Sequence, residues 1–202
     1  MGIDGQRWVR IALRVGIVAV VALAVILVET RTRSGVLWRL ITFTYQANLL
    51  AAVYYASTLV SPRTDRRAGL RGAVVLYVVV AGLIWNLFLS GVSMGYTGAN
   101  VLLHVVVPVL ALAEWVLVGG DQARVRWWQP VAWLAYPAAY LGAAVLILNH
   151  LGRRAPYYFL DPGAIGTSAV IGNVALLALG FLGLGFSLFG VARLVEKSRL
   201  RV

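Results

Sequence analysis

The residues of this chain that can take part in chemistry lie mainly in two short segments. The first contains Thr42, Thr44, Gln46 and Asn48, and the second contains His104. Hydroxyl, amide and imidazole groups donate and accept hydrogen bonds, and both ring nitrogens of a histidine need partners. The chain has no cysteine, which excludes a thiol nucleophile, a disulfide and a thiolate metal site. The residue types therefore indicate a site built from hydroxyl, amide and imidazole groups.

The elements that must position these groups are six apolar runs. Each run comes close to the roughly 20 helical residues that cross a bilayer core, and 61% of the chain is apolar while 12% is charged. We therefore expect an all-α integral membrane protein, a single six-helix transmembrane domain spanning residues 1–202. The expected helices are 8–28, 38–60, 72–92, 101–118, 130–148 and 169–194.

The distribution of the basic residues predicts how the chain is oriented in the membrane. The net charge of +11 is spread over the ends of the runs without a basic face or a nucleic-acid module, so we expect no nucleic-acid partner. Thirteen of the 18 Lys and Arg residues lie in the two terminal segments and after the second and fourth runs. Basic segments stay in the cytoplasm, which predicts cytoplasmic termini and a multi-pass protein of the cell (inner) membrane. We expect the first run to be an uncleaved helix, because it continues to Val28 beyond the small residues Ala22 and Ala24.

This topology places the polar residues at similar depths. At 1.5 Å per residue, the polar positions from Thr42 to Asn48 lie about 6 to 15 Å below the outer end of their helix, and His104 lies about 6 Å below the outer end of its own. Asn86 reaches the same half from a third helix. Polar groups within a membrane usually face the bundle interior or a wet cavity. The sequence therefore predicts an outward-opening polar pocket in which Thr44 or Thr42 meets His104.

Two prolines and one glutamate refine this picture. Pro108 cannot donate to the His104 carbonyl, and Pro137 cannot donate to the Trp133 carbonyl, so both carbonyls should be free and both helices should bend. Glu114 lies too far along its helix to orient His104. It should pair with an arginine at the cytoplasmic end or be protonated.

Structural roles compete with these functional ones. A helical threonine commonly donates its hydroxyl to the carbonyl four residues back, and a buried histidine can simply be a satisfied core residue. The two histidines lie far apart in the sequence without an acidic cluster nearby, and the glycines form no phosphate loop. We expect no metal and no cofactor.

Several short motifs resemble a known family. They are Phe43-Thr44-Tyr45-Gln46-Ala47-Asn48-Leu49, then Asn100-x-x-x-His104 with Pro108 and Glu114-Trp115, then Trp133-x-x-Tyr136-Pro137-x-x-Tyr140, then Pro156-Tyr157-Tyr158-Phe159-Leu160-Asp161. In order and spacing, from about Trp38 to Leu194, they resemble a group of bacterial six-helix membrane proteins. That group is similar to the androgen-induced and androgen-dependent membrane hydrolases of animals.

The resemblance implies a threonine nucleophile and a histidine base that cleave fatty acid esters of hydroxy fatty acids. His104 matches the histidine. The pattern Phe-Thr-x-Gln-x-Asn favours Thr44 as the nucleophile, whereas the distance from Trp38 favours Thr42. The animal enzymes carry Asp or Asn three residues after the threonine, where this chain has Tyr45 or Ala47.

Under this reading His104 takes the threonine proton, and other polar residues bind the substrate or the acyl oxyanion. These candidates are Asn48, Gln46, Asn86, Asn100, Tyr136, Tyr140, Tyr157, Tyr158 and Asp161. The expected partners are the bilayer and a lipid or fatty-acyl ester substrate. Two alternatives remain: an acyltransferase that uses the same site, and a noncatalytic lipid-binding or scaffold protein.

Overall fold

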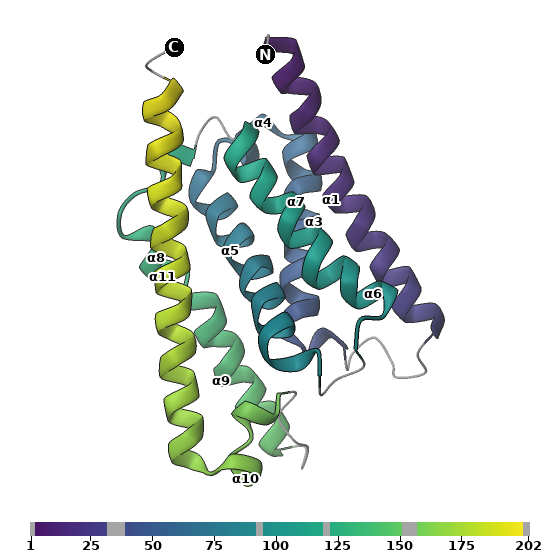
Figure 1. Cartoon of the computed structure of the whole chain (residues 1–202), viewed down its shortest axis with the longest axis vertical. Coiled ribbons are helices and arrows are strands. Elements are labelled where there is room, and N and C mark those ends of the chain that lie inside the picture. Colours follow the sequence, from purple (N-terminus) through teal and green to yellow (C-terminus); the bar gives the residue numbers. More distant parts are fainter. Residues whose placement is uncertain (1–2, 32–38, 92–94, 119–121, 151–156, 200–202) are drawn as a thin grey trace.

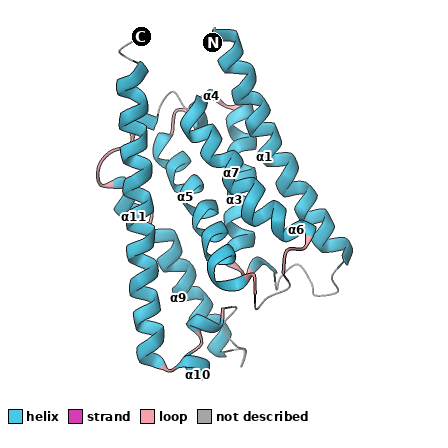
Figure 2. Cartoon of the chain, in the orientation of Figure 1, coloured by secondary structure: helices cyan, strands magenta, loops and turns pink. Residues whose placement is uncertain are grey.

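The computed structural model describes residues 3–31, 39–91, 95–118, 122–150 and 157–199, where the chain forms helices and turns without a strand (Figures 1 and 2). The longer helices are α1 (Ile3–Arg31), α3 (Phe43–Val60), α5 (Ala68–Ile84), α7 (Val107–Ala113), α9 (Ala135–His150) and α11 (Thr167–Arg199). Short α-helices are α4 (Pro62–Asp65), α6 (Gly98–Val101), α8 (Gln129–Ala132) and α10 (Pro162–Ile165). Three π-helical turns, η1 (Trp85–Leu89), η2 (Leu102–Val106) and η3 (Glu114–Val118), continue the α-helices, and η4 (Gln122–Arg124) and η5 (Tyr158–Leu160) are 3₁₀ turns.

Four helical segments of the described chain are long and apolar enough to cross a membrane. They are Gly5–Arg31, Ala68–Leu89, Gly98–Val118 and Thr167–Lys197. This confirms an all-helical architecture suited to a membrane. The two other expected runs correspond to α3, which has 18 residues, and to the pair α8 and α9. The expected boundaries at residues 38 and 92 lie outside the described residues.

The two termini lie at the same end of the molecule, together with α4, while α6 and α10 lie toward the opposite end (Figure 1). The first and last long helices therefore both have their basic ends at the terminal end.

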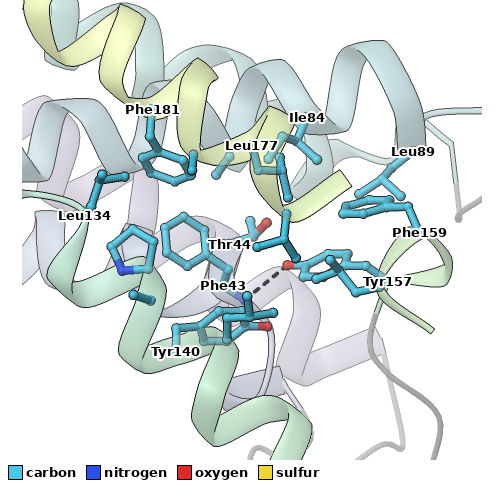
Figure 3. A pocket seen from close by; sticks show the side chains of 17 residues that line it. Phe43, Thr44, Ile84, Leu89, Leu134, Tyr140, Tyr157, Phe159, Leu177 and Phe181 are labelled. Carbon is cyan, nitrogen blue, oxygen red and sulfur yellow. Dashed lines mark hydrogen bonds between the residues drawn. The ribbon is translucent and has the colours of Figure 1, made fainter. Parts of the chain in front are cut away.

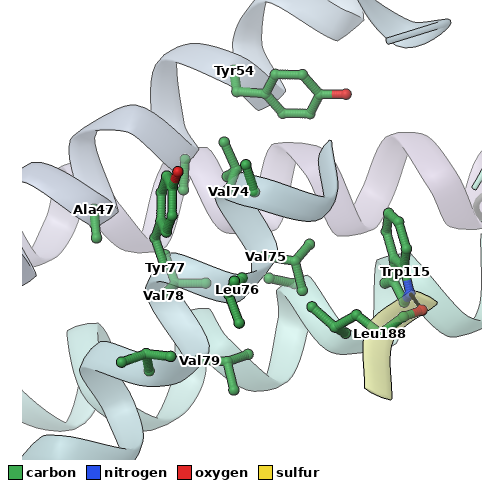
Figure 4. Packing of buried hydrophobic residues seen from close by; sticks show 14 of the residues in the cluster. Ala47, Tyr54, Val74, Val75, Leu76, Tyr77, Val78, Val79, Trp115 and Leu188 are labelled. Atoms are coloured by element: carbon green, nitrogen blue, oxygen red, sulfur yellow. Dashed lines mark hydrogen bonds between the residues drawn. The ribbon is translucent and has the colours of Figure 1, made fainter. Parts of the chain in front are cut away.

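Helix α5 is the centre of the bundle. Its residues from Arg71 to Gly82 are all buried, and it packs against α3, α7 and α11. A helix that is apolar around its whole circumference belongs inside a protein, where every face meets another helix. Figure 4 shows the consecutive side chains Val74 to Val79 packed among Ala47, Trp115 and Leu188. This rigid centre fixes the relative positions of α3 and α7.

A break divides the run that the sequence predicts as one helix over residues 130–148. Helix α8 ends at Ala132 and α9 begins at Ala135, so the run is interrupted close to Pro137, where the sequence predicts a bend. The cause is Pro137, which cannot donate to the Trp133 carbonyl. The hydroxyl of Tyr77 donates to this carbonyl instead, at 2.8 Å, so the prediction of a free carbonyl is confirmed and its partner is now identified.

A buried network of charges joins four elements at the terminal end. Arg14 of α1 donates to Glu114 at 2.9 Å and to Asp65 at 2.7 Å, and Arg71 of α5 also donates to Asp65. The side chains of Arg14, Arg71 and Glu114 are almost fully buried. Glu114 is therefore paired with arginine, which was one of the two alternatives that the sequence left open. The network holds α1, α4, α5 and η3 together.

Candidate active site

Thr44 and His104 meet in the half of the bundle away from the termini. Thr44 is the second residue of α3, and His104 lies in η2, 60 positions later in the sequence. The Thr44 hydroxyl oxygen is 3.3 Å from Nε2 of His104, and Nδ1 of His104 is 2.9 Å from the Asn100 carbonyl oxygen. From the two depths the sequence predicted that Thr44 or Thr42 would meet His104, and the structure brings Thr44 to it.

These two contacts assign the tautomer of the imidazole. A carbonyl oxygen can only accept, so Nδ1 of His104 carries the hydrogen that is donated to Asn100. Nε2 of a neutral ring then has a lone pair, and the Thr44 hydroxyl donates to it. Thr44 is thereby hydrogen-bonded to the nitrogen that can take its proton. This is the arrangement of a nucleophile with its general base.

The ring of His104 is held by stacking. The indole of Trp85 lies face to face with it, with ring centroids 4.4 Å apart and planes 20° apart, and the His104 side chain is 6% exposed. Both residues lie in π-helical turns, which occur frequently at functional sites because the extra residue re-aims nearby side chains.

The backbone around His104 is also secured. A Cβ at Gly82 would lie 2.6 Å from the His104 carbonyl oxygen, so the close approach of these helices needs glycine there. The amide of Asn86 donates to the His104 carbonyl at 3.2 Å. This is the carbonyl that Pro108 leaves free, as the sequence predicted. Asn86 thus helps to hold the backbone of His104 in place.

Thr44 also lines a partly open cavity of about 220 Å³. Its side chain is directed into this space among Phe43, Tyr157 and Leu177 (Figure 3). The full lining is Phe43, Thr44, Ala81, Ile84, Leu89, Leu134, Pro137, Ala138, Tyr140, Leu141, Tyr157, Phe159, Leu160, Val174, Leu177, Ala178 and Phe181. The name Thr44 cavity is used below for this space. The lining is mainly hydrocarbon, so the expectation of a polar pocket is wrong for this space.

Tyr157 brings a second hydroxyl to the Thr44 cavity. Its oxygen accepts a hydrogen bond from the Phe43 backbone N–H at 3.1 Å, and it also interacts with Thr44 and Tyr140. Burial raises the pKa of the Tyr157 phenol above its ordinary value of 10, against the lowering effect of these hydrogen bonds. Tyr157 is therefore a neutral O–H group beside Thr44.

The other polar residues of the first segment stabilise the start of α3. Thr42 is its N-cap: the hydroxyl accepts from the Tyr45 N–H at 3.4 Å and donates to the Arg39 carbonyl at 2.8 Å. The helix therefore begins at Phe43, and Thr42 precedes it instead of lying inside it as expected. The amide of Asn48 donates to the Thr44 carbonyl at 2.9 Å.

Two tyrosines of α9 fasten the same segment. Tyr136 donates to the side-chain oxygen of Gln46 at 2.5 Å, and Gln46 donates to the Leu40 carbonyl at 2.6 Å. Tyr140 donates to the Ile41 carbonyl at 2.8 Å while its ring lines the Thr44 cavity. These bonds hold the turn before α3, which places Thr44 precisely enough to meet His104.

The remaining candidates have separate partners. The side chain of Asn100 donates to the Gly95 carbonyl at 2.8 Å, and Asp161 caps α10 by accepting from the Gly163 N–H at 2.9 Å. Tyr158 is 50% exposed and lies in a neighbouring groove. Among the described residues, no group of three or more His, Cys, Asp or Glu side chains could hold a metal ion.

The sequence analysis missed the role of Trp85 and the role of the Asn100 backbone carbonyl in orienting His104. Trp85 gave no signal, because an indole on an apolar helix is ordinarily a packing residue. Asn100 was predicted through its side chain, yet its backbone carbonyl is what orients His104. The spacing of four residues between them was the signal, since it places a carbonyl below a side chain on one helical face.

Comparisons of the chain with protein-family models, with curated proteins and with solved structures find no match. The geometry of Thr44, His104 and the adjoining cavity is therefore what supports a function.

Proposed function

We propose that this protein is an intramembrane hydrolase of lipid esters in which Thr44 is the nucleophile and His104 the general base. The observation that carries the proposal is the 3.3 Å contact between the Thr44 hydroxyl and Nε2 of His104, made at the wall of an apolar cavity. The apolar lining of the cavity can hold a hydrocarbon chain, and the ester group would lie next to the Thr44 hydroxyl. The resemblance to the androgen-regulated hydrolases agrees with this choice.

In the first step the Thr44 oxygen attacks the ester carbonyl carbon while Nε2 of His104 takes the hydroxyl proton. The tetrahedral intermediate then collapses. The bond between the carbonyl carbon and the alcohol oxygen breaks, and His104 gives its proton to that oxygen. The alcohol leaves, and the acyl group remains as an ester on Thr44.

In the second step water attacks the acyl-threonine. His104 takes a proton from the water and returns it to the Thr44 oxygen as the carboxylic acid is released. The sum is ester plus water giving acid plus alcohol. An alcohol in place of water would give acyl transfer by the same steps.

The negative charge on the intermediate needs hydrogen-bond donors. Tyr157 is the best-placed candidate, because its hydroxyl interacts with Thr44 and is neutral. Thr44 lies in the first turn of α3, where the helix dipole favours negative charge, while the N–H groups of Phe43 and Tyr45 already donate to the hydroxyls of Tyr157 and Thr42. Asn48 and Asn86 already donate to backbone carbonyls and are less suited to this role.

The membrane arrangement belongs to the same proposal. We place both termini in the cytoplasm of a cell whose inner membrane the chain crosses six times. The shared end of the termini and their basic residues support this orientation. Thr44 and His104 then lie in the outer half of the bilayer.

A noncatalytic lipid-binding protein is the second candidate. It is favoured by the hydrocarbon lining of the cavity and by the number of polar side chains that bond to backbone instead of facing it. The same cavity would then hold a lipid chain without cleaving it.

Labelling with an octyl fluorophosphonate separates the two candidates, because the reagent reacts with activated hydroxyl groups. Purified wild type should carry the adduct on Thr44, as mapped by mass spectrometry. Thr44→Ala and His104→Ala should abolish the adduct, and Thr42→Ala should retain it. An unlabelled, folded wild type would favour the lipid-binding candidate.

A further inference from the structure

A second apolar space adjoins the Thr44 cavity. It is a groove of about 660 Å³ between α11 and the continuous segment formed by α5 and η1, and the name α5–α11 groove is used for it. Its rim includes Leu87 and Leu176, which are 69% and 64% exposed. Both walls belong to segments that are long and apolar enough to cross a membrane. If these segments span the bilayer as proposed, the exposed rim of the groove faces lipid hydrocarbon.

Four side chains line both spaces: Ile84, Phe159, Leu177 and Phe181. Leu177 and Phe181 are one turn apart on α11 and so lie on the same face. Phe159 comes from η5 and stacks on Tyr157, with centroids 5.4 Å apart, while its other contact is with Tyr158 in the groove, at 5.6 Å. These four residues form a wall that is one side chain thick.

The volume of the Thr44 cavity limits what it can hold. An apolar cavity of about 150 Å³ accommodates a benzene ring, so by proportion about 220 Å³ holds on the order of nine carbon atoms. The acyl chain of a membrane lipid is longer than this. Its remaining carbons need apolar space continuous with the cavity, and the α5–α11 groove lies directly across the wall.

We infer that the acyl chain of the ester crosses this wall, with its carbonyl beside Thr44 and its distal part in the α5–α11 groove. The inference rests on the proposed function and adds the position of the acyl chain and the side chains that contact it. Ile84, Phe159, Leu177 and Phe181 then determine which chain lengths are accepted. Esters of short acids fit within the Thr44 cavity and do not depend on the wall.

Photo-crosslinking tests the position of the chain without requiring catalysis. The probe is a hexadecyl ether with a diazirine in mid-chain, presented in phosphatidylcholine vesicles that contain the purified protein. Adducts should map to the wall and to groove residues such as Leu87, and Gly180→Trp should remove the groove adducts, because Gly180 lines the groove but not the Thr44 cavity and a Cβ there has open space around it. Leu179→Trp is the matched control, because Leu179 is on the same helix, is 65% exposed and lines neither space. Adducts confined to exposed residues of α1 would overturn the inference.

Labelling rates then connect the wall to Thr44. Gly180→Trp should slow labelling of Thr44 by a hexadecyl fluorophosphonate about tenfold or more, because it fills the groove that holds the distal chain. It should leave labelling by the octyl reagent within about twofold, since Gly180 does not line the Thr44 cavity. Leu177→Ala, which removes bulk, should label at least as fast as wild type with both reagents. Equal effects of Gly180→Trp on both reagents would contradict the crossing while leaving Thr44 as a nucleophile. Wall adducts in a wild type that neither reagent labels would instead refute hydrolysis and retain the chain position.

Discussion

The indole ring of Trp85 covers one face of the imidazole of His104, with 4.4 Å between ring centroids and 20° between planes. This stack fixes the plane in which Nε2 is directed at Thr44. When His104 becomes protonated during the reaction, the indole face also attracts the cation, an interaction worth about 0.5 to 2 kcal/mol. Trp85 is thus a positioning residue that acts through His104.

Replacing Trp85 should separate positioning from binding. We expect Trp85→Ala to lower kcat for ester hydrolysis by about tenfold to a hundredfold, because small misplacements of reacting groups have effects of that size. KM should change little. Trp85→Phe keeps a stacked ring and should restore most of the rate. Steady-state kinetics on the three proteins provide the comparison, and an unchanged kcat in Trp85→Ala would refute the positioning role.

Replacing Thr42 should mainly affect stability, and replacing Thr44 should mainly affect activity. Thr42→Ala removes the N-cap of α3 and should lower the free energy of unfolding by about 1 kcal/mol while preserving most activity. Thr44→Ala should lower kcat at least about a thousandfold, with a stability change within about 1 kcal/mol. Esterase assays and denaturant unfolding in detergent measure both quantities. If Thr42→Ala abolished activity and Thr44→Ala lowered only stability, Thr42 and not Thr44 would be the nucleophile.

Tyr157→Phe should lower kcat strongly and lower the free energy of unfolding only slightly. Loss of a donor to the oxyanion lowers kcat by about 10²- to 10³-fold, and loss of the bond from the Phe43 N–H costs about 1 kcal/mol. Tyr158→Phe is the control, because that residue lies in the groove and is half exposed. If both variants kept the wild-type kcat, another donor would have to serve the oxyanion.

The buried charge network should make Glu114 indispensable for stability. Glu114→Gln leaves Arg14 and Arg71 without a full countercharge and should lower the free energy of unfolding by about 3 kcal/mol or more. Glu196→Gln offers a matched comparison, since its pair with Arg193 is exposed and is worth at most about 1 kcal/mol. Equal losses in the two variants would show that burial of the Glu114 pair adds nothing.

Asp65 should make this network sensitive to acid. Burial by itself raises the pKa of the Asp65 carboxyl, but the hydrogen bond from Arg14 and the charges of Arg14, Arg71 and Arg10 outweigh it and hold the pKa below its ordinary value of 3.8. A depressed pKa stabilises the fold at all pH values above 3.8 and loses this effect as the pH falls through the lower, folded-state pKa. Wild type should therefore exceed Asp65→Asn in unfolding free energy at neutral pH, and the difference should shrink below pH 3.8. A constant difference would contradict the shift.

Some of this structure followed from local sequence rules. Helix lengths follow from apolar runs, and the consequences of Pro108 and Pro137 follow from a missing N–H, so both freed carbonyls were predictable. Topology and depth predicted that Thr42 or Thr44 would lie near His104, without selecting between them. In each case one physical constraint acts along a single helix.

Other features depend on several elements at once. The charge network needs α1, α4, α5 and η3 together, and the sequence assigned Arg14 and Arg71 to topology alone. The sequence analysis did not predict the hydrocarbon lining of the Thr44 cavity. The sequence does not show that the side-chain amides of Gln46 and Asn48 donate hydrogen bonds to backbone carbonyls. The π-helical turns that contain Trp85 and His104 likewise had no signal that the sequence analysis used.

The most direct measurement of the central claim is detection of an acyl group on Thr44. Wild-type protein mixed with p-nitrophenyl octanoate and quenched in acid should yield a peptide that carries the octanoyl mass on Thr44, with one equivalent of p-nitrophenol released in a burst. His104→Gln should show neither the burst nor the adduct. A folded wild type without octanoyl-Thr44, or equal acylation of the His104→Gln protein, would contradict the pairing of Thr44 with His104 as nucleophile and base.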